Sequence, residues 1–552
     1  MSRNRTLAIW GLVLVTILFV FAGEASGGPA AIWPSVVAVA LAFITRDIYS
    51  SLFLGAFAGA ILLADGNIAT AFVDLFAKHM IPPLTDRWNV SALAFSLMMG
   101  GFVELLNRIG GMQALARIVL GTGDSRRRAS LGVFAMGGVV FFDGLASSML
   151  VGKTMRPITD RAGVSREKLA FIVDSTASPI AAFALISTWI AFELTMIQNG
   201  LALYGESAFN DALAFSHLSP YQILIQTLPY RFYNYFVLLI VFLTVWLGRD
   251  FGPMRAAERK GPPAAPPRTE ASDETPGRGS IVLTLIPLAL LVVAVFGGLY
   301  LNGLTNLDSA VDLTGMARIV QAFGAAEADL VFVTATAFAS VVAMLFLYFH
   351  GRAKKADNPT VVFFEGMRQM FLPVLILVFA FTLGSVIREL ETANWLVQIL
   401  DGNFPVAALP TVVFLLAAVM SFSVGSAWGT MGLLTPLCVP IAAALTGLES
   451  GAAPGPVVIA TIGAVLAGAV FGDHCSPISD TTIVSAFASG CDAVEHVRTQ
   501  IPYALTAAGI AVVFGYLPAG MGISPFLPLF LGAVACWAAI RFLGRRPPQA
   551  DR

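Results

Sequence analysis

The sequence predicts an all-α polytopic membrane protein made of two inverted-topology repeats, each with a re-entrant helical hairpin and an interrupted transmembrane helix. Composition is the first observation: 57% of the 552 residues are hydrophobic and 12% are charged, whereas soluble domains are about half apolar and about 25% charged. The second observation is that the apolar residues form long runs. The third is that two stretches far apart in the chain share one pattern of polar interruptions.

The apolar runs are candidate membrane spans of about 17 to 25 residues. We expect helices because period-2 alternation is absent and a backbone in lipid must form its hydrogen bonds within its own segment. The first run exceeds the roughly 7 to 15 apolar residues of a signal peptide, which favours an uncleaved helix. The runs lie near 7–23, 31–45, 48–64, 89–107, 130–152, 169–191, 222–247, 281–301, 329–349, 361–387, 407–422, 426–447, 456–472, 474–490, 500–518 and 524–543.

Charge and cysteine usage exclude other classes of protein. The net charge is -1 and no basic stripe is interleaved with aromatic residues, so no nucleic-acid partner is expected. The cysteines lack the paired spacing of a disulfide framework or a zinc knuckle. We expect no cofactor. The expected partners are the lipid bilayer, small cations and protons, and a homodimer is left open.

Basic residues set the expected orientation, because short loops rich in Lys and Arg stay in the cytoplasm. Three arginines at 126–128 precede one apolar segment, and the loop 153–168 after it is also basic. Segment 249–279 combines prolines with mixed charges, as flexible linkers do. We therefore expect a cytoplasmic linker between an N-terminal transmembrane half, 1–248, and a C-terminal half, 280–545.

The apolar segment 129–152 has basic residues on both sides, so both of its ends should lie in the cytoplasm. We expect a re-entrant hairpin that turns at FFDGLASSM, which contains Asp143, Gly144, Ser147 and Ser148. Such a turn is tolerated at membrane depth only where protein or water surrounds it. The alternative is one ordinary span with a misplaced basic flank.

The two halves repeat one arrangement. An interrupted helix at 169–191 follows the first hairpin. In the C-terminal half, a second hairpin at 407–447, broken around Gly425 and Thr430, precedes an interrupted helix at 456–490. The copies match at a Ser-Pro-Ile motif and at a later serine, namely Ser178, Pro179, Ile180 and Ser187 against Ser476, Pro477, Ile478 and Ser485.

The loops that join hairpin to helix differ in charge. Loop 153–168 is basic, whereas loop 446–455 holds Glu449 and no basic residue, so the two loops should face opposite sides of the membrane. Inverted repeats whose interrupted helices meet at the midplane are the architecture of secondary transporters. A polar break at membrane depth costs free energy, and it is retained in such transporters because it builds a substrate site.

Three segments carry a resemblance to a known family: DSTASPIAAFALISTWIAFE, FSVGSAWGTMGLLTP and FGDHCSPISDTT. They resemble the NhaC-type Na+/H+ antiporters, members of an ion transporter superfamily of inverted-repeat carriers, over roughly residues 30 to 545. The resemblance implies exchange of Na+, or of Li+, for H+ in the inner membrane of a bacterium. It also implies the alternative of exchanging organic acids such as malate and lactate with coupled ions.

The residues themselves suggest how exchange would work. Pro179 and Pro477 each remove a backbone donor, so we expect breaks one turn upstream that free carbonyls beside Asp174 and Asp473. Burial raises a carboxyl pKa by as much as about 3 to 5 units from about 3.9. A buried aspartate would then titrate near neutral pH, where a proton and a sodium ion compete for it.

Asp473 is the first candidate carrier, followed by Asp480, Asp174 and Asp143. Asp480 lies seven residues after Asp473, two helical turns away. The expected Na+ site combines Asp473, Ser476 and Asp480, with Ser147, Ser148, Ser178 and Thr430 as further ion-binding hydroxyls.

Each candidate has a simpler interpretation. Asp480 and Asp174 could be helix caps, and the serines could allow close helix packing. His474 could relay protons, with an unperturbed pKa near 6.5, or only bond a broken backbone. We expect an interfacial Glu193 and packing roles for Trp189 and Trp428.

Three other functions compete with cation exchange. A carrier of small carboxylates could use the half-helix N-termini near Gly144 and Gly425, but no arginine lies inside either break. An intramembrane metal hydrolase at His474 and Cys475 lacks an HExxH pair, so no enzymatic activity is expected. A channel is disfavoured because two inverted sites suggest alternating access.

Overall fold

The computed structural model describes residues 28–45, 47–109, 125–141, 143–208, 220–262, 281–306, 326–350, 358–392, 404–448, 454–477 and 479–546, with the isolated residues Thr16, Val20, Arg318, Ala322 and Trp395. Within these residues the regular structure is helical, apart from one β-bridge between Asp250 and Arg545. The expected first span at 7–23 and most of the linker lie outside the described residues.

The helices are long and apolar enough for a multi-span membrane protein. Eight of those described could cross a membrane, or up to twelve if each bent pair is one span. This confirms the predicted all-helical class. All described α-helices, including those too short to cross a membrane, are in chain order α2 (Trp33–Thr45), α3 (Ile48–Leu63), α4 (Ile68–Asp74), α5 (Arg87–Ile109), α7 (Arg126–Val139), α8 (Gly144–Arg161), α9 (Arg166–Phe183), α10 (Thr188–Ala208), α11 (Pro220–Thr227), α12 (Phe232–Leu247), α13 (Gly252–Lys260), α14 (Ile281–Asn306), α16 (Ala328–His350), α17 (Pro359–Gln369), α18 (Phe371–Glu389), α20 (Leu409–Val424), α21 (Ala427–Leu445), α22 (Pro456–Cys475), α23 (Asp480–Ser489), α24 (Ala493–Ile510), α25 (Leu517–Gly520) and α26 (Phe526–Leu543).

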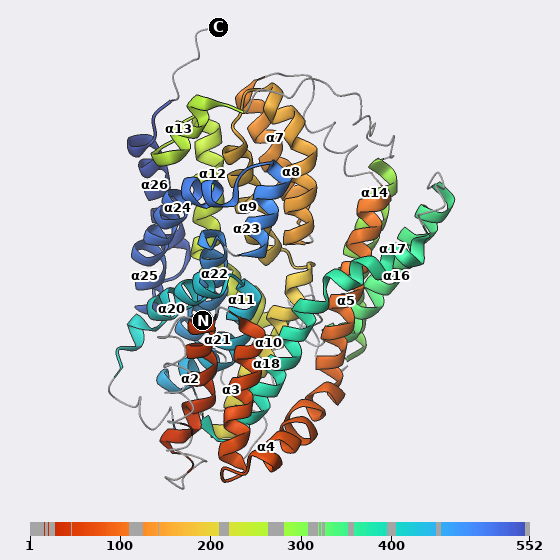
Figure 1. The fold of residues 1–552 in the computed structure, drawn as a ribbon, viewed down its shortest axis with the longest axis vertical. Helices are drawn as coiled ribbons and strands as arrows, with labels where there is room; N and C mark the ends of the chain where they lie inside the picture. The colour runs from red at the N-terminus through yellow and green to blue at the C-terminus, as the bar shows by residue number, and fades with distance from the viewer. Residues whose placement is uncertain are drawn as a thin grey trace.

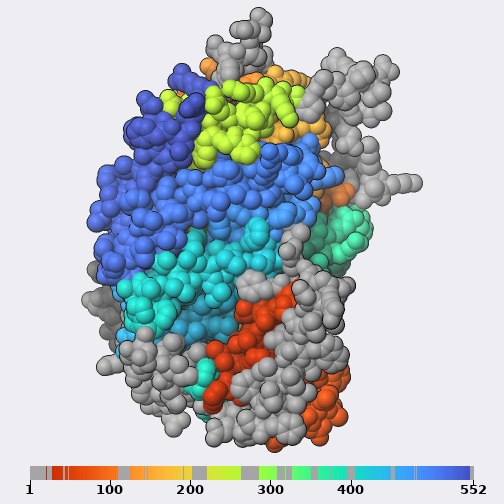
Figure 2. Space-filling model, turned by 60° about the vertical axis from the view of Figure 1, so that its left-hand side comes forward, coloured from red at the N-terminus to blue at the C-terminus, as the bar shows by residue number. Residues whose placement is uncertain are grey.

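Helix α22 lies at the centre of the molecule, and α26 lies at its edge (Figure 1). Of the most apolar stretch of 18 residues in each helix, 83% is buried inside the protein in α22 and 22% in α26. The outer face of α26 is therefore the kind of surface that lipid covers. Helices α5, α14, α16 and α17 pack on one another and form an arm beside this body. Figure 2 shows α13, in yellow-green, at the same end of the molecule as the dark-blue C-terminal helix.

Two helical hairpins surround the central helices. Helices α7 and α8 form the first, and both of its arms pack on α9. Helices α20 and α21 form the second, which turns at Gly425 with φ +71°, and both of its arms pack on α22. The first hairpin extends beyond the expected 129–152, because its helices continue through the flanking basic residues.

The helix breaks differ from the expectation. Helix α9 continues through Pro179 and ends at Phe183, and α10 starts at Thr188 after a 56° bend. The expected break beside Asp174 is therefore wrong: packing of α9 against α7, α8, α22 and α24 holds the helix despite the missing donor. Helix α22 does end at Cys475, just before Pro477, since the residue before a proline disfavours helical geometry.

Glycines set the spacing between α22 and α20. A Cβ on Gly472 would lie 2.4 Å from the carbonyl oxygen of Ala418, and one on Gly468 would lie 2.6 Å from that of Phe414. The Ser421 hydroxyl donates to the Ala469 carbonyl at 2.6 Å across the same contact. Small residues that allow close backbone approach are typical of helix packing in membranes.

Candidate functional site

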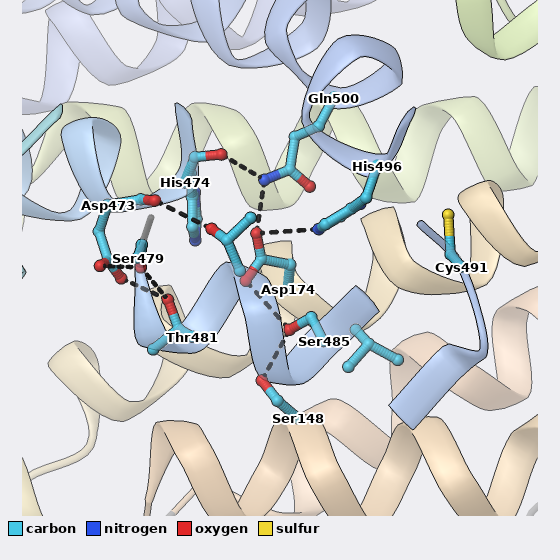
Figure 3. Close-up of polar contacts among 12 residues, drawn as sticks. Ser148, Asp174, Asp473, His474, Ser479, Thr481, Ser485, Cys491, His496 and Gln500 are labelled. Atoms are coloured by element: carbon cyan, nitrogen blue, oxygen red, sulfur yellow. Dashed lines mark hydrogen bonds and ion pairs between the residues drawn. The ribbon is translucent and has the colours of Figure 1, made fainter. Parts of the chain in front are cut away.

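Asp473 lies at the C-terminal end of α22, beside the break, and is 1% exposed. Its Oδ1 accepts a hydrogen bond from the Ser479 hydroxyl at 2.5 Å, and its Oδ2 accepts one from Thr481 at 2.6 Å (Figure 3). Its carbonyl accepts from the Thr482 hydroxyl at 3.0 Å. The carboxylate therefore lies at the N-terminus of α23, where the helix dipole favours negative charge.

Asp174 lies in the middle of α9 and is fully buried. The Ser485 hydroxyl of α23 lies 3.1 Å from its Oδ1, and the Gln500 amide of α24 donates to its Oδ2 at 2.5 Å. His496 Nε2 lies 3.4 Å from the same Oδ2. Ser148, at the start of α8, lies 2.9 Å from Ser485. Asp174 thus joins elements of both halves of the chain (Figure 3).

Several buried oxygens on α9 and on the helices that contact Asp174 lack hydrogen-bond partners in the described part of the chain. The hydroxyls of Ser147, Ser175 and Ser178 and Oε1 of Gln500 are buried and have no hydrogen-bond partner among the described residues. Ser175 and Ser178 lie within about one turn of Asp174 on α9, and Ser147 precedes Ser148. Because buried polar groups are normally satisfied, these oxygens are suited to bind an ion.

Helix α24 connects the two carboxylates. The Gln500 amide that binds Asp174 also donates to the His474 carbonyl at 2.7 Å, and His474 directly follows Asp473. The His474 Nδ1 atom lies 3.0 Å from the Tyr233 hydroxyl of α12. The His474 ring therefore bonds a tyrosine rather than the broken backbone.

The tips of both hairpins lie near the first break, between α9 and α10. Thr188 donates to Asp143 Oδ2 at 2.8 Å, and a Cβ on Gly144 would lie 3.5 Å from the Ser178 hydroxyl and 3.7 Å from Trp189 Nε1. The Trp189 ring lies 5.7 Å from that of Trp428, at the tip of the second hairpin. The two tips therefore approach each other through these tryptophans.

The other predicted site residues make different contacts. Thr430 donates to the Ser426 carbonyl one turn earlier, at 3.0 Å. Ser476 is buried within the break, and its carbonyl accepts from the Ser479 backbone. Asp480 is the first residue of α23, where Ser479 is the N-cap; its side chain lies outside the described part. Ser187 donates to the Ala181 carbonyl at 2.9 Å, unlike its expected equivalent Ser485.

Sequence reasoning missed Ser479, Thr481, His496 and Gln500. Ser479 and Thr481 lie in the hydroxyl-rich motif SPISDTT, which was the available signal. His496 and Gln500 are four apart, so they share one helix face, and that polar pair on an apolar helix could have been noticed. Their contacts with Asp174 join residues more than 300 positions apart, which spacing does not indicate.

Two further expectations are corrected. Glu193 is not interfacial: it is 1% exposed and pairs with Arg231, which is fully buried. An arginine therefore does reach the first break, because Arg231 also donates to the Ala182 carbonyl at the end of α9. Arg231 precedes α12, so its position in the sequence gave no indication of this contact.

The comparisons with known proteins agree with a transporter. Profiles of the Na+/H+ antiporter family match residues 180–521. An uncharacterized protein of Haemophilus influenzae is 31% identical over 88% of this chain and 90% of its own. The malate-2H(+)/Na(+)-lactate antiporter of Bacillus subtilis is 34% identical over 20% of this chain and 24% of its own.

Solved structures share the fold. The YdaH transporter of Alcanivorax borkumensis superposes with a TM-score of 0.54 at 16% identity, covering 84% of this chain and 90% of that one. Neisseria gonorrhoeae MtrF gives a TM-score of 0.50 at 14% identity, covering 92% and 96%. The protein is thus a multi-pass integral membrane transporter with bacterial homologues, not an enzyme, and the chain belongs to the Na+/H+ antiporter family.

Proposed function

We propose that this protein exchanges Na+, with Li+ as a second cation, for H+ by alternating access. The observation that carries the proposal is the fully buried carboxylate of Asp174, together with buried oxygens that lack hydrogen-bond partners among the described residues on its own helix and on the helices that contact it. Sodium is a hard cation, and transporters bind it with oxygen ligands at broken helices near the midplane. A carboxylate provides the charge, and serine hydroxyls and an amide oxygen provide neutral ligands.

Competition for one negative charge would couple the two ions. Protonated Asp174 is neutral and attracts a cation weakly, whereas ionised Asp174 attracts Na+, with the oxygens of Ser147, Ser178 and Gln500 as added ligands. Desolvation favours Asp174 neutralised by a proton or by Na+ over a bare buried carboxylate. Exchange follows because proton and cation cannot both neutralise the carboxylate.

Asp473 is proposed as the second charged member of the site. Both carboxylates already accept hydrogen bonds, Asp473 from Ser479 and Thr481 and Asp174 from Ser485 and Gln500. The difference is that α9, which carries Asp174, also carries buried hydroxyls without hydrogen-bond partners among the described residues, at Ser175 and Ser178. We therefore give Asp174 the larger role in ion binding. Asp480, Asp143, Ser148, Ser476 and Thr430 remain proposed contributors, with His474 as a proposed relay.

The proposed inverted repeat is supported by where helix ends meet. Arg166, at the start of α9, lies 3.4 Å from the carbonyl of Gly490, which ends α23. Helix α9 therefore begins at the membrane side where α23 ends, so the two interrupted helices run in opposite directions. We place this side in the cytoplasm because loop 153–168 and the linker 249–279 are basic, which leaves loop 446–455 outside.

The proposed halves, 1–248 and 280–545, each contain one hairpin and one interrupted helix. In each, both hairpin arms pack on the helix that follows. The close contact of Trp189 with Trp428 supports a site built between the halves.

Exchange of small organic acids is a second candidate. A cavity of about 390 Å³ lies between α5, α10 and α18 and is lined by Asp86, Asn89, Gln198, Asn199 and Arg388, which is large enough for a solute. The malate-2H(+)/Na(+)-lactate antiporter among the relatives favours the same alternative.

Purified protein in liposomes containing a pH dye would separate the two candidates. Pulses of Na+, Li+, K+, malate and lactate would be applied in turn. Proton movement with Na+ or Li+ alone supports cation exchange. Movement only with malate or lactate replaces it with the acid exchanger.

A further inference from the structure

A buried ion pair occupies the first helix break. Arg231, just before α12, forms a two-pronged contact with Glu193 of α10: Nη1 lies 3.1 Å from Oε1 and Nη2 lies 2.8 Å from Oε2. Arg231 is 0% exposed and Glu193 is 1% exposed. Planar bidentate pairing of this kind is the strongest arrangement of these two groups.

The same guanidinium caps the end of α9. Its Nη1 also donates to the Ala182 carbonyl, in the last turn before the break, and its Nη2 donates to the Thr227 hydroxyl at 3.3 Å. Ser187 takes the neighbouring Ala181 carbonyl. Each of these carbonyls at the end of α9 therefore already accepts a hydrogen bond from a side chain of the break.

The charge of Arg231 bears on the ion site because arginine stays protonated in proteins. Ala182 follows Asp174 by eight residues on α9, which corresponds to about 12 Å. At that separation, with an effective dielectric constant of about 20, an uncompensated guanidinium weakens cation binding at Asp174 about tenfold. Glu193 cancels this repulsion.

We propose that Glu193 is a specificity-determining residue: by neutralising Arg231 in the first break, it keeps the site selective for cations. Without its charge, the break would carry the positive field that suits a small anion. The inference rests on the proposed cation exchange. It adds a residue that touches no transported ion and acts through Arg231.

The test compares variants whose effects have opposite signs. Na+ half-saturation is measured by proton flux in liposomes and, independently, by the Na+-dependent shift of melting temperature in detergent. Glu193→Gln should raise the half-saturation concentration about tenfold. Arg231→Gln leaves the carboxylate unopposed and should lower it at a pH high enough to keep that buried carboxylate ionised, and the double variant should fall between them.

Two controls separate charge from structure. Glu193→Asp keeps the charge and should stay within about threefold of wild type, because its Coulomb contribution is retained. Arg87→Gln removes an arginine paired with Glu327 in an exposed bridge and should change nothing. If Glu193→Gln does not fold, Arg231→Gln alone still tests whether the pair acts through its charge, because loss of structure would not make Na+ bind more tightly.

A rise in half-saturation with both single variants, unrelieved in the double variant, would overturn the inference and leave a purely structural pair. Failure of the proposed function looks different, since wild type itself would then show no Na+ response. In that case malate and lactate replace Na+ in the same experiment. Glu193→Gln should then strengthen, and Arg231→Gln weaken, the response to the acid; unchanged responses would again overturn the inference.

Discussion

Replacing Asp174 with asparagine removes one buried negative charge and almost nothing else. The substituted side chain has the same size, its carbonyl can accept from Gln500, and its amide can donate to Ser485, whose hydroxyl can reverse. Hydrogen bonds to charged groups contribute about 1.5 to 3 kcal/mol and neutral ones about 0.5 to 1.5 kcal/mol. We therefore expect unfolding free energy to fall by about 1 to 3 kcal/mol, which a folded protein can tolerate.

The expected effect on ion binding is much larger. A unit charge about 4 Å from a cation contributes about 4 kcal/mol at an effective dielectric constant of about 20, so its removal weakens Na+ binding about 1000-fold. Sodium pulses on liposomes containing a pH dye should then produce no proton movement. The melting temperature and the elution volume in detergent serve as measures of folding.

The same substitution at Asp492 is a matched control. Its Oδ1 caps α24 by accepting from the backbones of Val494 and Glu495, and asparagine is an equally good cap. Asp492→Asn should retain full exchange. Full Na+-dependent flux from a well-folded Asp174→Asn protein would refute the assignment. A greater loss with Asp473→Asn than with Asp174→Asn would make Asp473 the principal carrier.

Other regions give independent predictions. Single cysteines in 153–168 and 446–455 should be labelled by an impermeant thiol reagent from opposite sides of the membrane. Labelling of both loops from the same side would contradict the predicted inverted topology. Gly472→Ala places a Cβ 2.4 Å from the Ala418 carbonyl oxygen and should cost about 1 to 3 kcal/mol of stability, measured by denaturation, whereas Gly509→Ala, with nothing within 4 Å of the added Cβ, should be neutral or slightly stabilising. In the linker, burial, and then the charge of Asp250, raise the pKa of Glu258 above its ordinary 4.5. A raised carboxyl pKa contributes stability below about 4.5 that is lost as pH rises through the raised value. The rate at which trypsin cuts after Lys260, divided by its rate on an unstructured peptide at the same pH, should therefore increase with pH, and Glu258→Gln should abolish the increase in this ratio.

Local patterns indicated much of the fold. Long apolar runs predicted the helices, and a polar interruption with basic flanks predicted the first hairpin, because these features act within one segment. The second hairpin was predicted from its repeat of the first pattern. Pro179 was misleading because neighbouring helices on several sides hold α9 together around it. Pro477, with Gly472 and hydroxyl-rich residues beside it, does mark a break.

The site could be predicted only in part. Asp174, Asp473 and Ser148 are brought into one polar region, and the sequence already marked them as polar residues in apolar surroundings. Their partners His496 and Gln500 come from a helix whose role depends on tertiary packing. The Glu193–Arg231 pair illustrates the same limit, since it joins residues 38 positions apart in different elements.

Competition between ions is the central claim, and the pH dependence of Na+ half-saturation tests it most directly. Half-saturation would be measured in wild-type liposomes at a series of pH values, with equal pH on both sides at the start. If one carboxylate carries either ion, each unit of decrease in pH below its pKa should raise the Na+ half-saturation about tenfold. Half-saturation that stays constant while the maximal rate changes would contradict a shared site and show that proton and cation bind different groups.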